Sequence, residues 1–195
     1  MSKEREYRSM ELRIEGGEDS YMVEGYASTF QPYVLFQRDG VDYSEQIAPT
    51  AFDEADMNDV VFRVDHAGTV YARTSAGTVE LGVDEHGLWN RTDLSKTRKA
   101  RELFEDIEAG NYPKMSFAFT VAEDHYDKAT HTRIIDRIAK LYDISPVSFP
   151  ANPGTELSVS TRDYFDGVIE MEKAERLERE RREAQIKKIK ILTEV

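Results

Sequence analysis

Apolar and polar residues alternate along most of the first 160 residues, which is the pattern of strands with one buried face. Near the start, Met10, Leu12 and Ile14 alternate with charged residues. Further strands are expected at 21–30, 60–65, 69–74, 78–83, 88–93, 115–122 and 133–143. Residues 31–40 contain Pro32 and Gly40 and are expected to form a loop. After the last strand, Pro146, Pro150 and Pro153 are expected to end regular pairing.

Two segments predict helices instead. Thr50 is a suitable N-cap for a short helix after residues 45–52. A longer helix is expected after Ser95 and is expected to stop at Gly110. Its apolar stripe recurs at i, i+3, i+4 and i+7, through Ala100, Leu103, Phe104 and Ile107. Many short strands with few helices predict an α+β protein, built as a compact, mostly antiparallel β-barrel or strongly bent sheet with helices outside.

The composition changes after Arg162. Residues 163–195 hold nine acidic and eight basic side chains. Four acid-before-base pairs at i, i+4 stabilise a solvated helix: Glu172–Arg176, Glu175–Arg179, Glu178–Arg182 and Glu183–Lys187. The apolar stripe is thin, so a partner-binding tail and a merely solvated helix both fit. We therefore expect one domain at 1–162 and a charged helical tail at 163–195.

The overall charge and the absence of cysteine narrow the function classes. The net charge of −12 argues against binding nucleic acid or an anionic membrane, because both need excess Lys and Arg. Without cysteine there is no disulfide, thiolate metal site or cysteine nucleophile. No signal peptide or spanning segment is visible, so a cytosolic protein is expected.

Three residues on separate segments form the minimum set for a serine hydrolase, in which a base activates a hydroxyl. Ser116 lies on the small-residue face of 115–122, which leaves room for a substrate. His66 follows the apolar run 60–65 in the same phase as Phe62 and Val64. Asp143 falls in an inward phase, where a carboxylate needs a partner. A locally bonded strand serine and a core histidine would show the same patterns.

Other residues remain as alternatives. Asp65 is a rival acid, although it neighbours His66 on the opposite face of the strand. His125 and His131 could hold a metal, but their surroundings are polar and turn-like and no helical His pair is present. We expect no metal and no cofactor.

The order of several short motifs resembles that of the tailed-phage prohead maturation proteases, which are serine peptidases related to the herpesvirus assemblins. The resemblance covers about residues 12–160. Its parts are Val23-Glu24-Gly25-Tyr26-Ala27-Ser28, Glu45-Gln46-Ile47-Ala48-Pro49-Thr50-Ala51-Phe52, a histidine after an apolar strand, Met115-Ser116-Phe117-Ala118-Phe119, and the run from Leu141-Tyr142-Asp143-Ile144-Ser145 to Pro153.

The resemblance implies a herpesvirus-protease-like barrel and a triad of Ser116 as nucleophile, His66 as base and Asp143 as orienting acid. Asp143 stands where the family often has glutamate and the assemblins have a second histidine, so His86 or His125 are fallbacks for the third member. Ser145 and Ser148, beside Pro146, are rival nucleophiles.

It also implies a serine endopeptidase that cuts phage scaffold and capsid proteins, and itself, inside the procapsid in the host cytoplasm. The partner would be the major capsid or scaffold protein, and homo-oligomerisation stays open. A non-catalytic assembly module with the same fold is the alternative.

Overall fold

Ten strands, two α-helices and one short 3-10 helix, η1 (Thr74–Ala76), form the regular structure of the described part of the chain. The computed structural model describes residues 5–13, 21–148 and 159–193. The chain divides into two compact units, Met1–Leu157 and Ser158–Val195. The predicted division into a protease domain at 1–162 and a tail at 163–195 stays a prediction.

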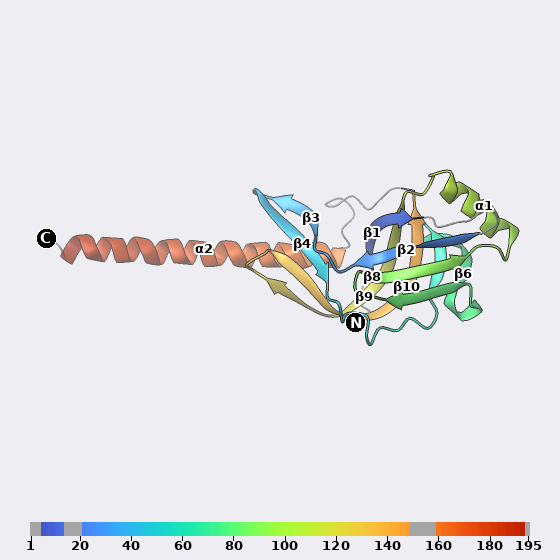
Figure 1. The fold of residues 1–195 in the computed structure, drawn as a ribbon. Coiled ribbons are helices and arrows are strands. Elements are labelled where there is room, and N and C mark those ends of the chain that lie inside the picture. The colour runs from blue at the N-terminus through green and yellow to red at the C-terminus, as the bar shows by residue number, and fades with distance from the viewer. Residues whose placement is uncertain (1–4, 14–20, 149–158, 194–195) are drawn as a thin grey trace. The chain divides into compact units, whose positions relative to one another are not determined.

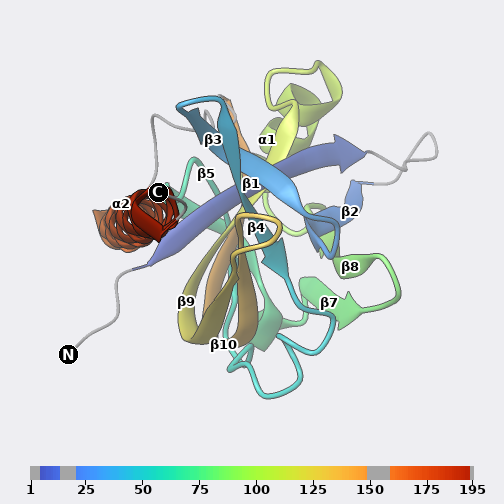
Figure 2. The same cartoon turned by 90° about the vertical axis from the view of Figure 1, so that its left-hand side faces the viewer.

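The strands of the first unit lie in one sheet, in the order β3-β4-β10-β9-β1-β2-β8-β7, with β5 paired to β10 and β6 paired to β5. Their bounds are β1 Glu6–Arg13, β2 Met22–Thr29, β3 Tyr33–Arg38, β4 Val41–Ile47, β5 Val61–Val64, β6 Ala67–Arg73, β7 Val79–Val83, β8 Gly87–Asp93, β9 Lys114–Asp127 and β10 Thr132–Val147. The long hairpin of β9 and β10 reaches away from the body at the end opposite helix α1 (Figures 1 and 2).

The expected α+β class is confirmed, but the expected closed barrel is not. In the described residues, the strand order ends at β3 on one side and at β7 on the other. Most pairs are antiparallel, whereas β10 pairs in parallel with both β4 and β5. Strand β10 therefore lies between β9 on one side and β4 and β5 on the other. Side chains of β9 and of the hairpin that begins with β5 can approach each other across β10.

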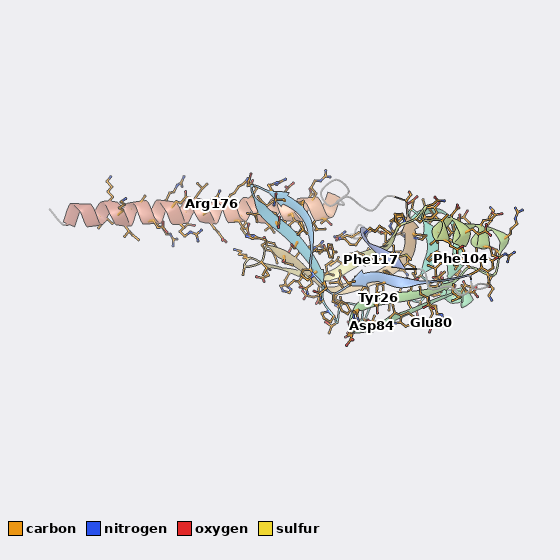
Figure 3. All side chains as sticks on the ribbon, turned by 45° about the horizontal axis from the view of Figure 1, so that its top comes forward. Tyr26, Glu80, Asp84, Phe104, Phe117 and Arg176 are labelled. Carbon is orange, nitrogen blue, oxygen red and sulfur yellow. The ribbon has the colours of Figure 1, made fainter. Side chains whose placement is uncertain are left out.

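Helix α1, Arg98–Glu108, forms where its apolar stripe predicts it. Thr97, rather than Ser95, caps it, since its side chain accepts a hydrogen bond from the Ala100 N–H. Gly110 follows in the left-handed conformation (φ 83°). The buried stripe joins the core, where the Phe104 ring lies 5.4 Å from that of Tyr21. Figure 3 labels Phe104 on α1 and Phe117 on β9, two members of this core.

Three local expectations are wrong. Residues 31–40 hold strand β3 and not a loop. No helix follows Thr50; instead, successive turns form, with Ala51 N bonding to Ala48 O and Asp53 N to Thr50 O. Pro146 does not end pairing, because β10 continues to Val147. Pro150 and Pro153 lie outside the described residues.

A network of charged side chains is buried between β1, β4, β9 and β10. Arg8 bonds to both carboxylate oxygens of Glu45 (2.5 and 2.7 Å) and to Glu6 (2.8 Å). Arg133 bonds to Glu6 (2.8 and 3.1 Å), to Glu45 (3.2 Å) and to Asp124 (2.7 Å). Burial alone lowers the pKa of Arg8, but the neighbouring carboxylates outweigh it and raise that pKa well above its usual value. Both guanidiniums therefore stay charged.

The second unit contains helix α2, Val159–Thr193. Large apolar side chains on it are exposed, among them Leu177 (54%) and Ile189 (61%). Arg182 pairs with Glu178 at 2.5 Å, one of the predicted i, i+4 pairs. None of the helices in the described ranges is long and apolar enough to cross a membrane.

Candidate active site

Ser116 lies on β9, between two neighbouring strands. It stands opposite Ser9 of β1 and opposite Ser145 of β10. The strand alternates as expected: Met115 and Phe117 belong to the hydrophobic core. Ser116 is on the other face and only 1% exposed. Pairing on both sides fixes the backbone of Ser116 and leaves its hydroxyl as the adjustable group.

His66 lies in the two-residue turn that joins β5 to β6. Both turn residues have positive φ, 47° for Asp65 and 55° for His66. This is the mark of the tight turns that match the twist of a hairpin. The Nε2 atom of His66 lies 2.6 Å from Ser116 Oγ. The imidazole side chain is 17% exposed, so its ring is sheltered but open to solvent at one side.

Asp143 completes a chain of hydrogen bonds. Its Oδ1 atom lies 2.6 Å from His66 Nδ1, and its side chain is 3% exposed. The parallel pairing of Asp143 with Val61 of β5 brings β10 beside the hairpin that carries His66. The structure thus brings together all three residues singled out in the sequence, although Ser116 is 50 positions and Asp143 is 77 positions from His66.

A fourth side chain belongs to this site. Ser145 is fully buried, and its hydroxyl donates to Asp143 Oδ1 at 2.8 Å, the same oxygen that faces His66. Sequence reasoning treated Ser145 only as a rival nucleophile. Its spacing of two from Asp143 on one strand, which puts both on the same face, was the available signal.

The geometry can activate a hydroxyl. A proton on Nδ1 facing the carboxylate leaves Nε2 as an acceptor for the Ser116 hydroxyl. The Asp143 carboxylate can then stabilise the imidazolium that forms when Ser116 loses its proton. With hydrogen bonds from His66 and Ser145, the buried Asp143 carboxylate has the partners that compensate for its loss of solvation.

The alternatives have other partners. Asp65 accepts hydrogen bonds from the backbone N–H and the hydroxyl of Ser148, both at 2.9 Å. His125 Nδ1 lies 2.6 Å from Asp136, and His131 Nδ1 lies 3.0 Å from the Tyr126 hydroxyl. Across the described ranges there is no group of three His, Asp or Glu side chains arranged to hold a metal ion.

His86, the other fallback for the third member, lies in the turn between β7 and β8. Its Nδ1 atom is 3.8 Å from the Glu85 carboxylate and its side chain is 67% exposed. Near it, a hollow opens over β2, β7 and β8, lined by Glu24, Gly25, Tyr26, Glu80, Trp89, Asn90 and Arg91. Tyr26, Glu80 and the neighbouring Asp84 are labelled in Figure 3. None of the lining residues belongs to the Ser116, His66 and Asp143 group.

Comparison with known proteins adds independent evidence. The family model described as caudovirus prohead serine protease matches residues 8–167. The prohead protease of Enterobacteria phage HK97 is 29% identical over 162 residues, which cover 81% of this chain and 67% of that protein. No solved structure matches significantly, so the expected herpesvirus-protease-like fold stays a prediction.

Proposed function

Because the chain belongs to the caudovirus prohead serine protease family, we propose that it is an endopeptidase that cleaves the scaffold and capsid proteins of its phage inside the procapsid. We further propose that it cleaves itself. The observation that carries the proposal is the unbroken hydrogen-bond chain from the Ser116 hydroxyl through His66 to Asp143, with both links at 2.6 Å.

In this mechanism Ser116 Oγ attacks the carbonyl carbon of the scissile peptide bond while its proton passes to His66 Nε2. Asp143 stabilises the imidazolium through Nδ1. His66 then gives the proton to the leaving amine, the C–N bond breaks, and an acyl-enzyme remains on Ser116. A water molecule, deprotonated by the same imidazole, attacks the ester carbonyl. The bond between the acyl carbon and Ser116 Oγ then breaks, His66 returns the proton to Oγ, and the second product leaves as a carboxylic acid.

A serine-directed phosphonate tests the nucleophile directly. The intact protein should gain the mass of the phosphonyl group at Ser116, located by peptide mass spectrometry. Ser116→Ala should gain none, and His66→Ala should react at least about a hundredfold more slowly, since general-base catalysis contributes typically 10²–10⁴-fold. Ser28→Ala is the matched control, because Ser28 is also a fully buried strand serine but lies on β2.

Substrate and self-cleavage need a second measurement. The chain is co-expressed with the capsid and scaffold proteins of its phage, and all products are measured by mass spectrometry. New termini should appear with the native chain and be absent with Ser116→Ala and with His66→Ala. Cleavage that survives both substitutions would reject the mechanism. A chain that neither cleaves nor is labelled would be a non-catalytic assembly module with this fold.

A further inference from the structure

Asp65 has no part in the proposed proton relay, yet it occupies a costly conformation next to His66. Its φ of 47° and the 55° of His66 are left-handed values that favour glycine over other residues. Neither residue is glycine, and such conformations persist at functional sites only when surrounding contacts hold them. The contacts of Asp65 show what holds this turn.

Three hydrogen bonds tie Asp65 to the end of β10. Its backbone N–H donates to Pro146 O at 3.2 Å. Its carboxylate accepts from the Ser148 N–H and from the Ser148 hydroxyl, both at 2.9 Å through different oxygens. Ser148 is 83 positions away in the sequence, so the link is tertiary and not part of the turn itself.

The same stretch of β10 also holds the imidazole ring. Asp143 bonds to His66 Nδ1, and Ser145 holds Asp143. The last residues of β10 and Ser148, which follows the strand, therefore contact His66 at its ring through Asp143 and its backbone turn through Asp65. A ring held only at Nδ1 could still shift with its turn, whereas two points of attachment fix the direction of Nε2 toward Ser116.

We propose that Asp65 is a positioning residue, which clamps the β5–β6 turn onto Ser148 so that His66 Nε2 stays within hydrogen-bond reach of Ser116. This inference depends on the proposed function, because it concerns the base of that mechanism. Since a displacement of about 1 Å at a reacting group can cost about 10²-fold in rate, loss of the clamp should slow acylation by about tenfold to a hundredfold.

Asp65→Gly separates the clamp from the conformation of the turn. Glycine adopts positive φ at no steric cost, so this variant relieves the backbone while removing both carboxylate bonds. Its thermal unfolding midpoint should stay near that of the wild type, whereas phosphonate labelling of Ser116 should be about tenfold to a hundredfold slower. Asp65→Asn should keep most of the rate, because its amide oxygen can still accept from the Ser148 N–H.

The matched control is Asp127→Gly. The Asp127 carboxylate also accepts from one backbone N–H (Ala129) and one hydroxyl (Thr130), both at 2.9 Å, but in the β9–β10 turn. It should label at the wild-type rate. A second readout is the proton NMR signal of the His66 Nδ1–H, which should exchange faster with solvent in Asp65→Gly and not in Asp127→Gly.

The outcomes are distinct. Asp65→Gly that folds and labels within twofold of the wild-type rate would overturn the clamp. If Asp65→Gly does not fold, Ser148→Ala carries the test: it loses only the hydroxyl bond and should label several-fold more slowly, and an unchanged rate would refute the clamp. Wild-type protein that is not labelled at Ser116 would instead refute the proposed function, whatever the Asp65 variants do.

Discussion

Replacement of Arg8 by methionine tests how the fold depends on its buried charges. Arg8 makes three charge-assisted hydrogen bonds, two to Glu45 and one to Glu6, and its side chain is only 6% exposed. Methionine fills similar space without charge. Among the described residues, the network holds two guanidiniums and three carboxylates (Glu6, Glu45 and Asp124), so the formal charge of these groups is −1 and becomes −2 in the variant.

Breaking a buried ion pair by removing one partner costs about 3–5 kcal/mol, because the other charge stays buried without that partner. Arg133 still bonds to both Glu45 and Glu6 in the variant, so the lower end of the range, about 3 kcal/mol, is expected. For a unit of this size, each kcal/mol lowers the unfolding midpoint by about 2–4 °C. At about 3 kcal/mol, the expected drop for Arg8→Met is roughly 6–12 °C.

Thermal unfolding followed by circular dichroism measures this midpoint. The control is Arg73→Met, since Arg73 also makes a two-point contact with a carboxylate (Asp59, 3.1 and 2.6 Å), but both side chains are more than 40% exposed. An exposed pair contributes about 0–1 kcal/mol, so the control should shift by only a few degrees. Equal shifts for both variants would refute the reasoning that burial makes the Arg8 network costly to break.

Three further predictions concern other parts of the first unit. Ser145→Ala should lower kcat about tenfold with KM little changed, because a hydrogen bond to a charged group is worth about 1.5–3 kcal/mol. Steady-state kinetics on a cleaved peptide checks this, and an unchanged kcat would show that Asp143 needs no hydrogen bond from Ser145. Gly87→Ala should lower the free energy of unfolding, measured in urea, by more than about 3 kcal/mol. A Cβ at this position would lie 2.0 Å from the backbone oxygen of Ser28, and overpacking typically costs about 1–3 kcal/mol even when side chains can move. A variant of wild-type stability would mean that β2 and β8 can move apart to accommodate the methyl group. Hydrogen bonds from Ser95 and the nearby Lys96 lower the pKa of Asp93 to about 2. A depressed pKa stabilises the folded state above the unfolded value, so this contribution is lost as the pH falls from about 4 to 2; Asp93→Asn should flatten that part of the stability curve, and a parallel curve would contradict the assignment.

Periodic segments were predictable from the sequence, and irregular backbone was not. The stripe of α1 and the alternation in β9 are set by which side chains reach the core, so both formed as expected. Strand β3 was missed because Pro32 and Gly40 signal a loop, yet the apolar run from Tyr33 to Phe36 between them pairs with β4. No α-helix forms after Thr50, because the backbone hydrogen bonds there join residues three positions apart, as in turns, and not four positions apart.

The candidate site was predictable in its members but not in its supports. Ser116 could be singled out because it lies on the small-residue face of a strand, and His66 and Asp143 because each falls in an inward phase of an apolar segment. The two residues of the β5–β6 turn, Asp65 and His66, are not glycine, so no local sign of their left-handed backbone conformation was present in the sequence. The bond from Asp65 to Ser148 depends on the parallel pairing of β5 with β10, which no short-range pattern encodes.

This parallel pairing also bears on when the chain could become reactive. Strands β5 and β10 meet only after the whole intervening polypeptide has been made and arranged, and contacts of such long sequence separation form slowly. A chain still emerging from the ribosome would carry the His66 hairpin and the Ser116 strand before it carried Asp143. In the mechanism proposed above, an unfinished copy would therefore lack the carboxylate that orients His66 during synthesis.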